Sequence, residues 1–138
     1  MPLSPEVVAA YENAEYVAFA ERDVVLRIGR RSPELDELLD FHRAGGAAFV
    51  TAANPRGERR GDAGNAAALS ALRDLVAAAG YPCYLGEGRD PRGEWPAEAS
   101  LLVIGIYREN AVALGRLFEQ NAIVFAERGR APELVLLY

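Results

Sequence analysis

The sequence predicts an α/β fold: a single mixed parallel and antiparallel sheet with about four helices packed on it, and α+β character at its edges. Two segments have the order strand–helix–strand, at 47–85 and 101–125, and such units usually make right-handed crossovers between parallel strands. Short strand pairs near both ends of the chain indicate antiparallel hairpins at the sheet edges. A length of 138 residues fits a single domain, 1–138.

The N-terminal third is predicted to contain a helix, a hairpin and a second helix. Both helices begin at a serine followed by a proline, Ser4–Pro5 and Ser32–Pro33, because serine caps a helix and proline fits its first turn. Apolar residues spaced i, i+3, i+4, i+7 between Leu35 and His42 indicate the second helix. Between the helices, 16–20 and 24–28 are β-type runs joined by a short turn.

The rest of the chain alternates between apolar runs and helical patterns. Glycine and proline mark the breaks between them. The predicted segments are strand 47–51, loop 53–64, helix 65–79, strand 83–85, loop 86–97, strand 101–107, a helix around 111–118, and strands 123–125 and 134–137.

Composition excludes several classes of function. A net charge of −5 argues against general nucleic-acid binding, and the absence of lysine excludes Schiff-base chemistry and a lysine-type phosphate loop. The single cysteine, Cys83, excludes an internal disulfide. No signal-peptide pattern and no apolar run of ~20 residues is present, so we expect a cytoplasmic protein without membrane contact. We expect no metal and no cofactor, because no ligand cluster or dinucleotide fingerprint occurs.

A site is expected where strand 47–51 ends. If strand 83–85 runs parallel to it and strand 101–107 returns antiparallel, the loops at 53–64 and 86–97 lie at the same end of the sheet as the start of strand 123–125. The polar and aromatic residues brought together there are the predicted ligand-binding residues: Thr51, Asn54, Asn65, Trp95, Glu98, Gln120 and Asn121.

Each of these residues also has a structural interpretation. Asn54 before a proline forms turns, Asn65 can cap a helix, Asn121 suits a left-handed helix end, and Trp95 can simply cover the sheet. Glu98 precedes an apolar strand, where an unpaired carboxylate is costly to bury. Glu98 is the one candidate catalytic group, and whether the protein is an enzyme stays open.

Three arginines in the first loop predict an anion site. Arg56, Arg59 and Arg60 stand among glycines ahead of a helix, a combination that favours phosphate or carboxylate groups. The only histidine, His42, lies on an apolar stripe near a helix end, where a structural imidazole is expected. Cys83 in a short strand is predicted to be a core residue.

Four blocks of sequence occur in this order: 49–55, Asn65 at a helix start, Gly88 with 95–98, and 118–123. Together they resemble the uncharacterised bacterial family catalogued as domain of unknown function 3293. The family usually has an aromatic or bulkier residue where this chain has Ala53, and often glycine where it has Glu119. The resemblance implies a grouping of these residues and no activity.

Three functions therefore compete. The first is a small-molecule site at the sheet end, with amides for hydrogen bonds, Trp95 as a wall and Glu98 as the charged group. The second is a protein-binding module that uses loops 53–64 and 86–97, since Trp and Arg at loop tips anchor interfaces. The third is a purely structural role, as a regulatory subunit or homodimer.

Overall fold

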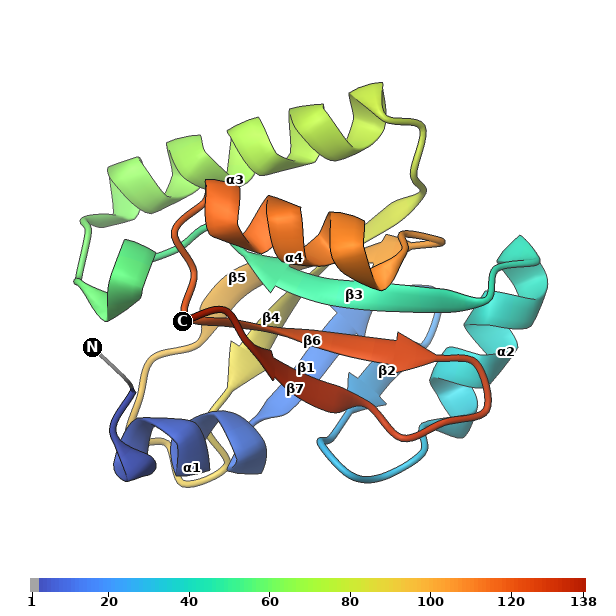
Figure 1. The fold of residues 1–138 in the computed structure, drawn as a ribbon, viewed down its shortest axis with the longest axis horizontal. Coiled ribbons are helices and arrows are strands. Elements are labelled where there is room, and N and C mark those ends of the chain that lie inside the picture. Colours follow the sequence, from blue (N-terminus) through green and yellow to red (C-terminus); the bar gives the residue numbers. More distant parts are fainter. Residues whose placement is uncertain (1–2) are drawn as a thin grey trace.

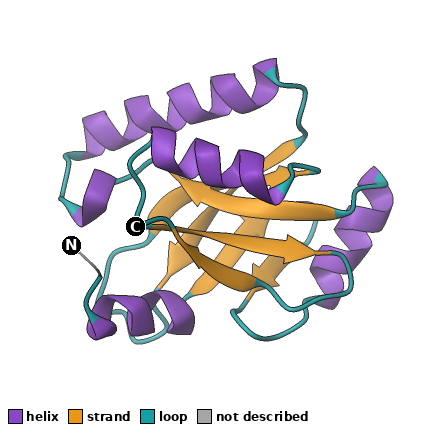
Figure 2. Cartoon of the chain, viewed as in Figure 1, coloured by secondary structure: helices purple, strands orange, loops and turns teal. Residues whose placement is uncertain are grey.

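The computed structural model describes residues 3–138, without the side chain of Arg56. These residues form four α-helices, one 3-10 turn and one seven-stranded sheet (Figures 1 and 2). Along the chain the elements are α1 (Pro5–Asn13), β1 (Glu15–Phe19), β2 (Asp23–Leu26), α2 (Pro33–His42), β3 (Gly46–Thr51), η1 (Pro55–Gly57), α3 (Asp62–Ala78), β4 (Cys83–Arg89), β5 (Glu98–Ile104), α4 (Arg108–Leu117), β6 (Ala122–Glu127) and β7 (Glu133–Leu136).

The sheet is antiparallel throughout, so the prediction of a mixed α/β sheet was wrong. The strand order is β2-β1-β4-β5-β3-β6-β7, and every strand pair in residues 3–138 is antiparallel. The protein has an α+β fold. The two hairpins expected at the sheet edges are confirmed, because β1–β2 and β6–β7 form its two outer pairs.

The error has a specific physical origin. Strands β3 and β4 point the same way, as predicted for a strand–helix–strand unit, but β5 lies between them and pairs with both. Likewise β5 and β6 are codirectional with β3 between them. Each helical crossover therefore skips one strand position, and an antiparallel strand from the other unit fills it. The direction of each strand follows from its own crossover. Which strand pairs with it in the sheet depends on a segment that is distant in the sequence.

Two apolar clusters lie on opposite faces of the sheet. On one face, Leu72 and Val76 of α3 and Ala111 of α4 pack against the sheet, and Figure 1 shows both helices on that side. On the other face, Leu35 and Leu39 of α2 pack in a cluster that contains residues of both β2 and β6. Four strands lie between them in the sheet order, so the sheet must curl to bring them into one cluster.

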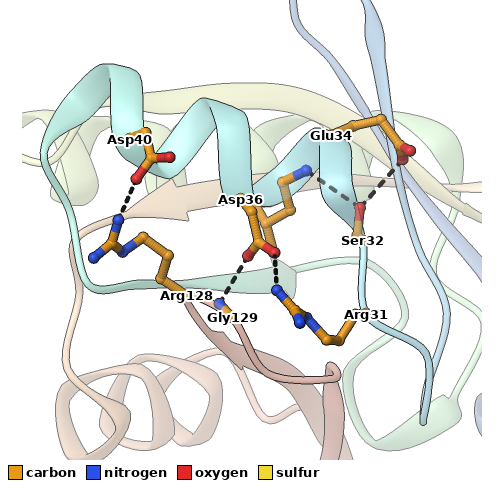
Figure 3. A network of polar contacts seen from close by, with 8 residues as sticks. Arg31, Ser32, Glu34, Asp36, Asp40, Arg128 and Gly129 are labelled. Carbon is orange, nitrogen blue, oxygen red and sulfur yellow. Dashed lines mark hydrogen bonds and ion pairs between the residues drawn. The ribbon is translucent and has the colours of Figure 1, made fainter.

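The two edges of the curled sheet are tied together on the side of α2. The N–H of Gly29, just after β2, donates to the carbonyl of Pro132, just before β7, at 2.9 Å. Asp36 of α2 accepts from the Gly129 N–H at 2.8 Å and pairs with Arg31, while Asp40 pairs with Arg128 (Figure 3). These contacts fix α2 against the β6–β7 turn. The sheet is curled strongly enough to form a half-barrel.

The serine caps are confirmed. Ser4 accepts from the Val7 N–H and Ser32 from the Leu35 N–H, each at 3.2 Å, with proline in the first turn of each helix. The segment predicted as loop 86–97 is partly strand, because β4 continues to Arg89 and leaves a shorter hairpin loop at 90–97. Within residues 3–138, no helix combines the length and hydrophobicity that crossing a bilayer requires.

Candidate functional site

The polar residues predicted to converge do so at the end of β3. Asn54 follows that strand, Asn65 lies in the first turns of α3, Glu98 begins β5, and Gln120 precedes β6. Hydrogen bonds join Asn54 to Asn65 and Glu98, and Gln120 to the carbonyl of Ala53. Their proximity is confirmed because the predicted strand directions were correct, although the predicted neighbours were not.

Asn54 is the centre of this cluster. Its backbone is left-handed, with φ 46° and ψ 65°, a conformation that asparagine tolerates better than most residues. Its side-chain Nδ2 donates to Glu98 Oε2 at 3.0 Å. Its Oδ1 accepts from the Arg60 N–H at 2.9 Å and from Asn65 Nδ2 at 3.0 Å. The amide therefore fixes the loop and holds the Glu98 carboxyl at the same time.

Asn65 closes the loop between β3 and α3. Its Oδ1 accepts from the Asn54 N–H at 3.0 Å, and its Nδ2 donates to Asn54 Oδ1 and to the Arg60 carbonyl, both at 3.0 Å. Both amide protons and the oxygen are thus used within the protein. The helix itself begins earlier than predicted, at Asp62. Asn65 therefore does not cap the helix, and its side chain bonds to the loop before it.

Two of the three loop arginines predicted to bind an anion have described side chains, and these two differ in their surroundings. Arg60 donates from Nη2 to the Ala52 carbonyl at 2.8 Å and from Nε to Asn65 Oδ1 at 3.4 Å, so its guanidinium is committed to the loop. Arg59 is exposed. The side chain of Arg56 lies outside the described part of the structure.

Thr51, Gln120 and Asn121 also make contacts within the protein. Thr51 Oγ1 donates to the Ala99 carbonyl at 2.9 Å. Gln120 is only 6% exposed and donates to the Ala53 carbonyl at 3.0 Å. Asn121 Nδ2 donates to the Tyr11 hydroxyl at 3.2 Å. These side chains support the end of the sheet.

Trp95 does not join the cluster through any hydrogen bond described here. It lies in the hairpin loop 90–97, is 63% exposed, and its backbone N–H donates to Asp90 at 3.2 Å. Glu119, where the family resemblance expects glycine, adopts a φ of 56°. That left-handed conformation at a helix end explains why glycine suits the position.

Glu98 faces the inside of the curled sheet. It lies opposite Gly88 on β4, which in turn lies opposite Tyr16 on β1. Directly paired residues of antiparallel strands project from the same face, so Tyr16 and Glu98 flank a position that has no side chain. A Cβ at Gly88 would lie 3.7 Å from Tyr16 Cδ1, so the tyrosine ring borders this gap and leaves room for at least a methyl group.

Tyr16, Gly88 and Glu98 form a row across three strands. Burial changes the acidity of two groups in this row. Desolvation raises the pKa of Glu98 above its ordinary range, and the hydrogen bond from Asn54 lowers it in part. Desolvation also raises the pKa of Tyr16, with smaller contributions from Tyr11 and from Glu98. No ion pair found among the described residues includes Glu98. The row thus presents a half-buried carboxyl that pairs with no cation among the described side chains.

The sequence interpretation missed Tyr11, Tyr16 and Gly88 as parts of this site. The Tyr16 hydroxyl donates to the Tyr11 carbonyl at 2.6 Å, and Tyr11 reaches Asn121 with its own hydroxyl. The alternation of apolar residues in β1 would place Tyr16 inward, but nothing local shows that β1 pairs with β4. Gly88 was part of the family resemblance without a role.

The raised pKa of Glu98 predicts a pH-dependent stability difference. As pH rises, Glu98 ionises first in the unfolded chain, so the native state loses stability until the pH passes the raised pKa. Glu98→Gln keeps an oxygen for Asn54 and cannot ionise. We expect its melting temperature to rise relative to the parent protein from pH ~4 upward and then to level off.

Thermal melts of both proteins over a pH series would measure this difference. Glu94→Gln is the matched control, because Glu94 is an exposed carboxylate in the adjacent hairpin loop, and its substitution should give a flat difference. A flat difference for Glu98→Gln as well would show that Glu98 ionises as an ordinary surface carboxyl.

The described residues bring together no group of three His, Cys, Asp or Glu side chains that could hold a metal ion.

A search of curated proteins and a search of solved structures each gave no match to this chain. A family model described as "Protein of unknown function (DUF3293)" matches residues 50–123, more than half of the sequence. The match begins at the end of β3 and contains α3, β4, β5 and α4, and with them Asn54, Asn65, Gly88 and Glu98. The chain therefore belongs to the DUF3293 family, as its sequence blocks indicated.

Proposed function

We propose that the protein is a cytoplasmic small-molecule-binding domain whose site lies around Glu98 at the end of β3. The observation that carries this proposal is the row Tyr16–Gly88–Glu98. It places a half-buried carboxyl beside an aromatic ring and a position without a side chain. A carboxyl with a raised pKa that pairs with none of the described cations costs stability, and such costs are typical of binding and catalytic groups.

The neighbouring amides support this function as positioning residues. Asn54 donates to the Glu98 carboxyl, and Asn65 and Arg60 hold Asn54 in turn. A binding group held by a saturated network of this kind is pre-organised, which reduces the entropy lost when a ligand binds. Asn54, Asn65 and Gln120 would therefore act on a ligand through Glu98 and the loop backbone.

The same carboxyl would be the acid–base group if the bound molecule is transformed. Proton transfer is most efficient when the pKa of the catalytic group lies near the working pH. Burial moves the pKa of Glu98 in that direction. Binding is the core of the proposal, and catalysis would be an additional property of the same site.

A thermal-shift screen with amino acids, nucleotides and sugar phosphates tests the proposal, because a bound ligand stabilises the native state by mass action. We expect at least one compound class to raise the melting temperature in a concentration-dependent way. The shift should shrink in Gly88→Ala, which fills the gap beside Glu98 with a methyl group, and persist in Glu94→Gln. Shifts that survive both Gly88→Ala and Glu98→Gln would place binding elsewhere and contradict the proposal.

A second candidate function is protein binding through the loops 53–64 and 86–97. The observation that favours it is Trp95, which is 63% exposed in the hairpin loop, since exposed tryptophans often anchor protein interfaces. Trp95→Ala separates the two candidates. It should leave the small-molecule shifts unchanged if the Glu98 site is correct, and it should abolish partner binding if the loops form the functional surface.

A further inference from the structure

We propose that the ligand group recognised at Glu98 is a cation, an ammonium or guanidinium group held between the Glu98 carboxylate and the ring of Tyr16. This inference rests on the proposed function and specifies the class of ligand. It differs from the phosphate or carboxylate ligand that the arginine-rich loop predicted.

The charge around Glu98 favours a cation. Among the described side chains, the neutral amide of Asn54 donates to its carboxyl, and the ring of Tyr16 lies across Gly88 from it. Arg60, the described cation in this hydrogen-bonded network, is bonded to the Ala52 carbonyl and to Asn65. A ligand cation would supply the missing countercharge at a partly desolvated position, where Coulomb attraction is stronger than in water. A ligand anion would meet repulsion from the same carboxylate.

The hydrogen-bonding capacity of Glu98 also favours a cation. Glu98 has one oxygen, Oε2, bonded to Asn54, and a carboxylate can accept further bonds on both oxygens. Ammonium and guanidinium groups carry several donors and no acceptors, so they complement this set of acceptors better than a neutral alcohol does.

The ring of Tyr16 borders the proposed site on the side opposite Glu98. Tyr16 packs edge-on against Phe49, with ring centroids 5.4 Å apart, and its hydroxyl is fixed by the Tyr11 carbonyl. The ring is therefore held rigidly beside the gap over Gly88. The ring atoms nearest this gap, Cδ1 and Cε1, form one edge of the ring, so Tyr16 acts as an apolar wall that keeps the position beside Glu98 partly desolvated.

The test uses the full chain and four probes that share a butyl group: n-butylammonium, n-butylguanidinium, butyrate and n-butanol. Isothermal titration calorimetry measures the binding of each probe to the parent protein, Glu98→Gln, Gly88→Ala and Glu94→Gln. We expect the two cations to bind more tightly than butanol, and butyrate to bind most weakly. Glu98→Gln should weaken cation binding about ten- to a hundred-fold, as expected for losing a charged hydrogen bond.

Gly88→Ala should also weaken the cations, whereas Glu94→Gln should leave their affinity unchanged. Butanol or butyrate binding as tightly as the cations would overturn the inference, as would cation binding that survives Glu98→Gln. If compounds from the broader screen bind in a manner sensitive to Gly88→Ala while both cations fail, the ligand class is wrong and the proposed site stands. If neither the screen nor the probes bind, the proposed function fails with the inference.

Discussion

Replacing Gly86 with alanine is expected to destabilise the protein by about 3 kcal/mol, the upper part of the range for overpacking. Gly86 is buried on β4 and lies opposite Ala18 on β1. A Cβ at this position would lie 2.2 Å from the Val17 carbonyl oxygen and 3.0 Å from Ala18 Cα. Both neighbours are backbone atoms, so no side-chain rotation relieves the clash. Strand β1 would have to move away from β4, and urea denaturation of the variant would measure the cost.

Gly88→Ala is the matched control for this substitution. It adds the same methyl group to the same face of the same strand, and its nearest neighbours would be Tyr16 ring atoms at 3.7 and 3.8 Å, which is ordinary van der Waals contact. We expect Gly88→Ala to fold with nearly the stability of the parent protein while losing ligand. Equal effects of Gly86→Ala and Gly88→Ala on stability would refute the close approach of β1 and β4.

Asn54→Ala is expected to cost about 3 kcal/mol, because it removes a donor, a doubly used acceptor and a residue suited to the left-handed region. The Arg60 N–H, Asn65 Nδ2 and Glu98 Oε2 would each lose a partner. The loss of the Asn54 hydrogen bond should also raise the pKa of Glu98 further, since that bond is what lowers it. Denaturant titration and a pH series of thermal melts measure the two effects.

Two variants separate the contribution of the Asn54 hydrogen bonds from that of its left-handed backbone. Asn54→Gly keeps the freedom to adopt a φ of 46° and removes only the amide, so its cost reports the hydrogen bonds. Asn110→Ala removes an exposed asparagine on α4 and should change stability little. If Asn54→Gly were as stable as the parent protein, the network around Asn54 would contribute nothing to the fold.

Local patterns in the sequence predicted most of the elements and not their arrangement. The Ser32–Pro33 cap and the β1–β2 hairpin depend on neighbouring residues, and both were correct. The parallel pairing was wrong because β5 inserts between β3 and β4, a choice made by contacts distant in sequence. Gly86 and Gly88 indicated a loop, yet both lie in β4. The glycine at 86 serves a close backbone approach, which is a known role for glycine within strands.

Only part of the site was predicted, because the sequence indicated strand directions and not strand pairing. Asn54, Glu98 and Gln120 belong to segments whose directions followed from the crossovers, so their convergence could be inferred. Tyr11 and Tyr16 come from the N-terminal segment, and only the pairing of β1 with β4 brings Tyr16 beside Glu98. Arg60 was predicted to bind an anion because its loop is rich in glycine and arginine. Its bonds to Ala52 and Asn65 became visible only in three dimensions.

The most direct test of the Glu98 site is chemical-shift mapping by NMR with the compound that gives the largest thermal shift. Backbone amide signals of the labelled protein are followed during the titration. We predict that the perturbed residues centre on Gly88, Glu98 and Asn54, with Tyr16 among them. Perturbations confined to the loop around Trp95 or to Arg59, with Gly88 and Glu98 unchanged, would contradict the account.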